Sequence, residues 1–295
     1  MEGVMMKNED KYAVAVRKPD KEIEIKVEEY KLGKKIKKLR KLPIFRGVFS
    51  FIDSLYLGMS TLMYSASFFE EDDELVTERT AEEQALDKKK EDALMAGTVA
   101  FSVILAIGIF FALPYFLSTL FQKVISSELI ISLLEGVIRL VIFILYILLI
   151  SLTPDIKRVF MYHGAEHKCI NCIEHGLELN VENVRKSSKH HKRCGTSFLI
   201  IVMLISIIFF MFIRVDSKIL RLVFRLLLIP VIAGVSFEFI RFAGRFDNPI
   251  VDLLSKPGLW MQRITTKEPD DDMIEVGIAS VEAVFDWKAW QKEEG

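Results

Sequence analysis

Histidine and cysteine are scarce in this chain of 295 residues, which has five of the first and three of the second. All eight lie between His163 and Cys194, and none lies outside that stretch. An odd number of cysteines, each close to a histidine, excludes a framework in which every cysteine forms a disulfide, and favours reduced thiols or a metal site. The sequence also lacks a phosphate-binding glycine loop and a repeat of the solenoid type, which argues against nucleotide-binding and repeat folds.

Charged residues are few in four long apolar stretches, at about 94–121, 130–152, 196–214 and 219–243. A helix that crosses the bilayer core needs ~20 residues, so we expect a multi-pass membrane protein with four transmembrane helices. The first residues lack the apolar run and the small-residue cleavage site of a secretory signal. Because 51% of the residues are hydrophobic while 27% are charged, the two kinds must be segregated along the chain.

Lysine and arginine gather on one side of the predicted spans. Lys88–Lys90 precede the first span, several cations lie between the second and third, and Arg245, Lys256 and Arg263 follow the fourth. Cytoplasmic loops of membrane proteins carry this excess of positive charge. We therefore expect both termini and the His/Cys loop to face the cytoplasm.

Two pairs of opposite charge lie within the predicted spans. Glu135 and Arg139 are four residues apart and Glu238 and Arg241 are three apart, which places each pair on one helix face. Ionisable groups at membrane depth are normally paired and face the bundle interior, so structural ion pairs are the first expectation. Glu238 with Arg241 is also a candidate support for the His/Cys loop. Arg225 is expected to extend to the outer surface.

The segments outside the spans also carry structural signals. Alternation over 12–31, with a turn at Pro19–Asp20, predicts a β-hairpin. The basic segment that follows, up to residue 46, is expected to contact anionic headgroups or, as the less favoured alternative, RNA phosphate. Helical spacing in 47–69 predicts an amphipathic helix in the membrane plane and is less typical of a fifth span. A second amphipathic helix is predicted over 273–290, where it would cover the hairpin.

Together these segments predict a mainly α fold. It has four transmembrane helices, a cytoplasmic loop whose His/Cys motif forms a helical hairpin, and a small cytoplasmic α/β part made of the N-terminal β-hairpin and the C-terminal helix. The predicted divisions are 1–46 (hairpin and basic segment), 47–69 (interfacial helix), 70–92 (charged linker or helix), 93–152 (first two spans), 153–195 (His/Cys loop), 196–244 (last two spans) and 245–295 (C-terminal segment with an amphipathic helix).

The order His163-x-x-Glu166-His167 puts two imidazoles four residues apart on a helix, where they can bind one ion together. It is also the H-x-x-E-H order of inverted zincins, in which the glutamate acts as general base on water. Gly176 is expected to end this helix and Asn180 to cap a second one, 181–189.

That second helix would return His191 and Cys194 to the first two histidines as further ligands. A metal with three protein ligands and one open position is the catalytic arrangement. Glu182, in the first turn of the second helix, is another candidate ligand.

A rival site uses Cys172, His191 and Cys194, with Cys169 completing a C-x-x-C. Four protein ligands would form a closed structural zinc site with no place for water or substrate. The two hypotheses compete for His191 and Cys194. A third possibility has no metal at all, with Glu166, Asn183 and Arg185 satisfying one another by hydrogen bonds.

The segments YHGAEHK, VENVRK, RCGTSF, EFIRFAGR and PGLWMQRITTKEPDD resemble those of the bacterial YqhQ family, uncharacterised membrane proteins often labelled predicted metal-dependent enzymes. EGVMM and AVAVRKPD near the N-terminus are similar too, so the resemblance covers nearly the whole chain. It implies a protein of the bacterial inner (plasma) membrane. The residues that fall on its motif positions are His163, Glu166, His167, Glu182, Asn183, Arg185, His191, Cys194 and Glu238. Cys169 and His190 depart from the pattern, which weakens the C-x-x-C half of the rival site.

The preferred hypothesis is a metal-dependent hydrolase that uses a divalent ion, zinc by its ligand types. The ligands are His163, His167, His191 and Cys194, with Glu166 as general base and Cys172, Glu182, Asn183, Arg185, Glu238 and Arg241 as supporting or reserve residues.

The alternative hypothesis is a non-catalytic membrane adaptor. Its structured loop would dock another membrane complex, or the translation or translocation machinery, and the basic run Arg185–Arg193 would contact ribosomal RNA or anionic lipid.

Overall fold

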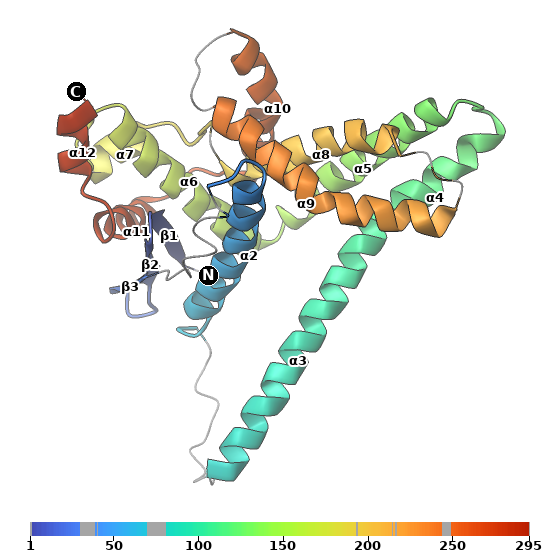
Figure 1. Ribbon diagram of the computed structural model, residues 1–295. Coiled ribbons are helices and arrows are strands. Elements are labelled where there is room, and N and C mark those ends of the chain that lie inside the picture. Colours follow the sequence, from blue (N-terminus) through green and yellow to red (C-terminus); the bar gives the residue numbers. More distant parts are fainter. Residues whose placement is uncertain are drawn as a thin grey trace. The chain divides into compact units, whose positions relative to one another are not determined.

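The computed structural model describes residues 2–29, 39, 41–69, 81–192, 194–213, 215, 217–243 and 249–294. The chain is mainly helical, with one three-stranded sheet near the N-terminus (Figure 1). It forms two compact units. The first comprises Met1–Phe69, Tyr146–Ser206 and Leu227–Gly295, and the second comprises Glu70–Leu145 and Ile207–Leu226.

The first unit contains the sheet and most of the short helices. Its elements are β1 (Gly3–Asn8), β2 (Lys11–Arg17), β3 (Ile23–Glu29), α2 (Phe45–Ala66), α6 (Pro154–Glu174), α7 (Val181–Lys186), α10 (Pro249–Thr265), α11 (Asp271–Glu282) and α12 (Trp287–Glu294). Those of the second unit are α3 (Ala81–Ile107), the π-helical turn η1 (Gly108–Ala112), α4 (Leu113–Thr119) and the 3₁₀ turn η2 (Leu120–Lys123). Three helices have residues in both units, namely α5 (Glu128–Ile150), α8 (Gly195–Met211) and α9 (Lys218–Ala243).

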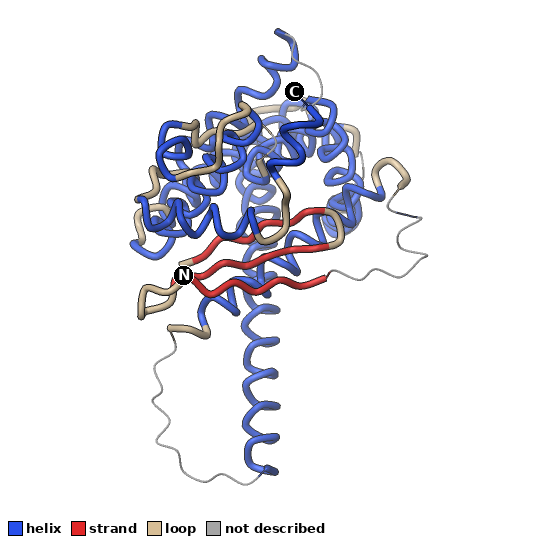
Figure 2. The backbone as a smooth tube through the Cα atoms, turned by 90° about the vertical axis from the view of Figure 1, so that its left-hand side faces the viewer, coloured by secondary structure: helices blue, strands red, loops and turns tan. Residues whose placement is uncertain are grey.

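The predicted β-hairpin is confirmed. Strands β2 and β3 pair antiparallel, with Ala13 opposite Val27 and Ala15 opposite Ile25. Strand β1, which was absent from the prediction, pairs with β2 on its other edge (Figure 2). Its six residues include two methionines and lack an apolar/polar alternation long enough to indicate a strand. Only its hydrogen bonds with β2 identify this segment as a strand.

Helices cover both faces of the sheet. On one face, α11 packs against β1 and β2, and the shared core contains Val4, Met6, Ala15, Met273 and Ile274. On the other face, Leu57 of α2 packs against Tyr12, Val14 and Val16. The predicted cover of the hairpin by a C-terminal amphipathic helix is thus confirmed, although the helix breaks after Glu282 and α12 begins at Trp287.

The predicted helical hairpin of the His/Cys loop is α6 and α7. Gly176 has φ +71, and the N–H groups of Gly176 and Leu177 donate to the carbonyls of Ile173 and Cys172. This is a Schellman motif, which ends α6 where predicted. The Asn180 side chain accepts from the Asn183 N–H at 2.9 Å and caps α7. Helix α7 ends at Lys186, three residues earlier than expected.

Three helical segments within the described residues are long and apolar enough to cross a membrane: Ala93–Lys123, Glu128–Ile150 and Ile219–Ala243. They correspond to three of the four predicted spans. The fourth forms α8, whose 17 residues extend about 26 Å at ~1.5 Å per residue, less than the ~30 Å bilayer core. A membrane-spanning α8 and the orientation of the chain therefore stay predictions.

The second unit contains a buried ionic cluster between α5 and α9. Glu135 accepts from Arg139 at 2.7 Å, as predicted, and also pairs with Arg225. The expected outward course of Arg225 is wrong, because this side chain is buried against Glu135. Pro114 has no backbone N–H and therefore cannot donate a helical hydrogen bond to the carbonyl of Phe110, four residues before it. The Nε of Arg139 donates to that carbonyl at 3.0 Å instead.

Several predictions fall outside the described residues. They concern most of the basic segment at 31–46, the first part of the linker at 70–92, Arg193 and Arg245.

Candidate metal centre

His163 and His167 lie on one face of α6 because they are four residues apart. The Nδ1 of His163 lies 3.0 Å from the Thr265 carbonyl, and the Nδ1 of His167 lies 2.7 Å from the Lys189 carbonyl. A carbonyl oxygen can only accept, so each Nδ1 carries the hydrogen. In its neutral form each ring therefore has its free lone pair on Nε2, the arrangement found in metal-binding histidines.

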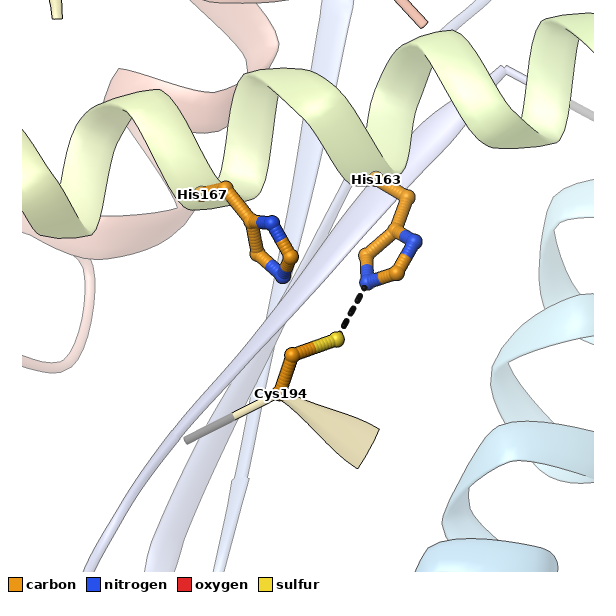
Figure 3. A group of neighbouring side chains, drawn as sticks. All are labelled: His163, His167 and Cys194. Carbon is orange, nitrogen blue, oxygen red and sulfur yellow. Dashed lines mark hydrogen bonds between the residues drawn. The ribbon is translucent and has the colours of Figure 1, made fainter. Parts of the chain in front are cut away.

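Cys194 lies immediately before α8 and caps its N-terminus. Its Sγ accepts from the backbone N–H of Thr196 at 3.3 Å and lies 3.1 Å from the Thr196 hydroxyl. The same sulfur is 3.2 Å from Nε2 of His163. Figure 3 shows the thiol and the two imidazoles pointing toward one another, and the ligand atoms of His163, His167 and Cys194 all lie within 4.8 Å of one another. We call these three residues the ligand group.

The electrostatics of the ligand group favour a thiolate. Burial raises the pKa of the Cys194 thiol, but hydrogen bonds and positive charge from His163 and His167 outweigh burial and lower that pKa to about 4. Burial likewise opposes a charge on His163, yet its contact with Cys194 raises the pKa of His163 to about 9. At neutral pH the metal-free pair is a thiolate beside an imidazolium, so a metal must displace one proton from His163.

The chemistry of the donors fits a zinc ion. A tetrahedral zinc with its usual Zn–N and Zn–S bond lengths has ligand atoms roughly 3.5 Å apart, so the observed spacing requires only a small inward movement of the side chains. Imidazole and thiolate together favour zinc over calcium or magnesium, which prefer oxygen ligands. Three protein ligands leave one tetrahedral position for water or substrate.

Glu166 lies on α6 between the two histidines and is half-buried. Burial raises the pKa of its carboxyl, while the positive charges of His163 and His167 act in the opposite direction. Within the described part of the chain, its carboxylate accepts no hydrogen bond. It is therefore uncommitted and close to the ligand group, as a general base requires.

A cavity of about 540 Å³ lies beside the ligand group. His163, Glu166 and Thr196 form part of its wall, and residues of β1, β2, α2 and the first half of α6 form the rest. Its volume is within the ~300–1,000 Å³ of small-molecule sites. Its wall is mainly apolar, but side-chain hydroxyls and Glu166 reach it, and for that reason we call it the polar cavity.

Two residues of α10 that sequence reasoning missed hold the centre together. Gln262 is fully buried, accepts from the His191 N–H at 2.8 Å and donates to the His191 carbonyl at 2.7 Å and to Ser197 at 2.8 Å. Thr265 supplies the carbonyl that orients His163. Their segment entered the sequence analysis only through its resemblance to a family motif. Gln262, Thr265 and Thr266 lie at helical spacing, and these uncharged polar side chains at the end of an amphipathic helix are the one signal in the sequence that could have indicated them.

Gly164 allows the chain after α10 to approach α6. The Lys267 N–H donates to the Phe160 carbonyl at 2.9 Å, and a Cβ added at Gly164 would overlap the Lys267 carbonyl oxygen. Only glycine fits here, one residue after His163.

Two polar side chains of α6 keep the segment between α7 and Cys194 extended. The Lys168 ammonium donates to the carbonyls of residues 185 and 187 at 2.9 and 2.8 Å. The Asn171 amide donates to the carbonyls of residues 188 and 190 at 2.6 and 3.0 Å. The carbonyl between them, that of Lys189, faces His167. This is why α7 ends early.

The structure does not bring His191 or Cys172 into the ligand group. Nε2 of His191 lies 3.2 Å from Glu174. Cys172 donates to the Glu178 carbonyl at 3.4 Å, and both Cys172 and Cys169 are buried in the apolar core. Within the described residues, the four ligands of the closed structural site are therefore not assembled.

The basic residues of α7 and of the segment after it pair with carboxylates of the same chain. Arg185 donates to Asp271 at 2.9 Å and Lys186 to Glu182 at 2.7 Å, and Lys189 pairs with Glu268 at 3.1 Å. The Asn183 amide donates to the Glu178 carbonyl. These pairs reduce the positive charge that the run offers to RNA or lipid phosphate, so docking through it stays a prediction.

Glu238 pairs with Arg46, just inside α2, and accepts weakly from the Ile44 N–H at 3.4 Å. Arg241 acts on it only through its charge. The structure thus places Glu238 between α9 and α2 and not with the ligand group.

A family described as a protein of unknown function, DUF1385, matches residues 42–287. An uncharacterized protein of Bacillus subtilis (strain 168), YqhQ, is 35% identical over 285 residues, which cover 95% of this chain and 88% of that protein. No solved structure matches the chain.

Proposed function

We propose a function for this chain, which belongs to the YqhQ-like DUF1385 family of proteins of unknown function. It is a membrane-bound hydrolase with a zinc ion at His163, His167 and Cys194. One observation carries the proposal. Backbone carbonyls bind Nδ1 of His163 and His167 and leave Nε2 of each ring available, next to the Cys194 thiolate. The Glu166 carboxylate and a cavity lie beside them.

The residues around the centre have distinct roles in this proposal. A bound zinc supplies Lewis-acid chemistry that activates water and polarises a carbonyl. Glu166 takes a proton as the oxygen of water bonds to the electrophilic carbon. When the bond from that carbon to the leaving group breaks, Glu166 returns the proton to the leaving group. Thr265 and Lys189 keep the two rings in the orientation that binds metal.

The membrane part of the proposal rests on the three long apolar helices. We add α8 as a fourth, short span, and place the ligand group and both termini on the cytoplasmic side, because lysine and arginine gather there in the sequence. The membrane is then the bacterial plasma membrane, which the resemblance to the YqhQ family implies.

Metal analysis of the full-length protein tests the ligand set. After purification without chelators we expect about one zinc per chain, falling below ~0.2 in His163→Ala and Cys194→Ala because each removes a ligand. Cys172→Ala is the matched control and should keep its zinc. Wild-type protein that contains less than ~0.2 zinc per chain, and gains none on zinc addition, contradicts the proposal.

Glu166→Gln tests catalysis separately from binding. The variant should keep its zinc and its fold but hydrolyse model esters and amides roughly 10²- to 10⁴-fold more slowly than wild type, because it cannot take a proton. If Glu166→Gln hydrolyses these substrates at the wild-type rate, Glu166 is not the general base.

A second candidate function is nucleophilic catalysis by Cys194 without metal, which the 3.2 Å contact with His163 favours. Alkylation distinguishes the two. If zinc is bound, adding it should protect Cys194 from iodoacetamide, whereas the nucleophile candidate expects rapid alkylation with or without zinc.

A further inference from the structure

A second cavity, of about 410 Å³, also reaches Cys194. It lies among α2, α8 and α9, and we call it the apolar cavity. Its wall includes Phe51, Leu55, Phe198, Leu199, Phe237 and Ile240. Apart from the Cys194 thiolate at its edge, no charged side chain of the described residues lines it, so it suits a hydrocarbon chain.

The ligand group borders both cavities. Ser54 belongs to the wall of both, Cys194 to the apolar cavity, and His163 and Glu166 to the polar cavity. A molecule that occupies both cavities would therefore place its middle beside the ligand group. Such a molecule must have one apolar end and one polar end.

The polar cavity indicates the character of the polar end. Its side-chain donors and acceptors are hydroxyls, such as those of Thr61, Ser65 and Thr196, together with His163 and Glu166. Among its described residues there is no lysine or arginine. Beyond the ligand group, a phosphate in this cavity would meet Glu166 but no lysine or arginine of the described residues to pair with it, so like-charge repulsion disfavours it there. An uncharged polar end fits better.

The apolar cavity is also close to lipid in the proposed arrangement. One wall belongs to Ile219–Ala243, which is long and apolar enough to span a membrane. On α2, the neighbouring side chains Ile52, Leu55 and Met59 are each more than half exposed, at 52%, 59% and 51%. Apolar exposure of this kind next to a cavity is typical of a surface that meets a membrane.

We propose that the substrate is an uncharged membrane amphiphile whose acyl chain occupies the apolar cavity and whose ester or amide bond reaches Glu166. This inference rests on the proposed hydrolytic function. In the reaction water adds its oxygen to the carbonyl carbon and gives a proton to Glu166. The bond from that carbon to oxygen or nitrogen breaks, and the leaving group takes the proton.

Photolabelling of the full chain in phosphatidylcholine nanodiscs tests the assignment. The two probes are a diacylglycerol and a phosphatidylglycerol with the same diazirine-bearing acyl chain. We expect the diacylglycerol to label Phe198, Leu199 or Ile240 at least about fivefold more than the phosphatidylglycerol, a difference of ~1 kcal/mol. Equal labelling by both probes, or labelling confined to α3, overturns the proposal.

Gly195 provides the blocking variant. A Cβ at Gly195 meets no atom within 4 Å, and the residue lines the apolar cavity. The Gly195→Phe ring should fill the cavity and lower diacylglycerol labelling at least about tenfold. Gly97→Phe is the matched control, because its Cβ also meets no atom within 4 Å but Gly97 lies on α3. It should label as wild type.

Zinc content, measured on the same samples, separates this inference from the proposed function. Gly195→Phe protein that keeps its zinc and labels as wild type overturns the lipid assignment alone. Wild-type protein that labels in the cavity but has no zinc supports the lipid assignment and overturns the hydrolase. If Gly195→Phe loses its zinc, Ile240→Trp is used in its place, because it fills the same cavity from α9. If Ile240→Trp keeps its zinc and labels as wild type, the lipid assignment is overturned.

Discussion

The zinc affinity of the ligand group should rise about ninefold between pH 7 and pH 8. Without metal, the Cys194 thiolate holds the pKa of His163 at about 9, so roughly 1% of the rings are neutral at pH 7 and roughly 9% at pH 8. Only the neutral ring binds zinc, so raising the pH favours binding by ~1.3 kcal/mol. The Cys194 thiol, with its pKa near 4, is already deprotonated throughout this range and adds nothing to the slope.

Competition with a chromophoric chelator, at constant ionic strength in nanodiscs, measures this slope. In Cys194→Ser the thiolate is absent and the pKa of His163 should return toward its ordinary value. Zinc binding would then be weaker but would change only about 1.3-fold between pH 7 and 8. Cys172→Ser should keep both the affinity and the slope of wild type. A wild-type affinity that is flat over this range, or an equal slope in Cys194→Ser, would refute the coupling of His163 to Cys194.

Three further substitutions test the surroundings of the centre and the second unit. Gln262→Leu removes three buried hydrogen bonds that hold the segment before α8, and should lower zinc affinity roughly 10- to 100-fold in the same competition assay. Glu135→Gln leaves Arg139 and Arg225 buried without a carboxylate. It should destabilise the protein by about 3–5 kcal/mol in denaturant unfolding, and an unchanged midpoint would contradict the burial of this cluster. Gly164→Ala should destabilise by about 1–3 kcal/mol, seen as a lower Tm, because the new Cβ overlaps the Lys267 carbonyl.

The parts of the centre that could be predicted from the sequence are those with local causes. The i and i+4 spacing of His163 and His167 places both rings on one helix face, whatever surrounds the helix. Gly176 and Asn180 end one helix and begin the next through backbone geometry that lies within a few residues. Cys194 could be expected nearby, because a helical hairpin returns the chain to its starting point.

The parts that could not be predicted depend on contacts between distant residues. The sequence predicts His191 as a metal ligand as strongly as it predicts Cys194. Lys168 and Asn171 hold the intervening segment extended, and the ring therefore faces Glu174. No spacing rule describes such a restraint.

The partners of two other groups are equally remote. Glu238 pairs with Arg46, 192 residues away in the chain, and the Thr265 carbonyl lies 102 residues from His163. For Arg225 the sequence indicated a position near the end of a span but not that Glu135 lies opposite it. Pairings of this kind are decided by how helices pack and not by the pattern within one helix.

The cover of the sheet by α11 has a consequence for the order of synthesis. Strands β1 and β2 are made long before Met273 and Ile274, which bury one face of the sheet and follow β2 by roughly 250 residues. At ~5–20 residues per second, that face waits on the order of 10 to 50 s for its cover. During that time its apolar surface is available to chaperones or to another chain. This face of the sheet is therefore buried in the fold only when α11 has been made.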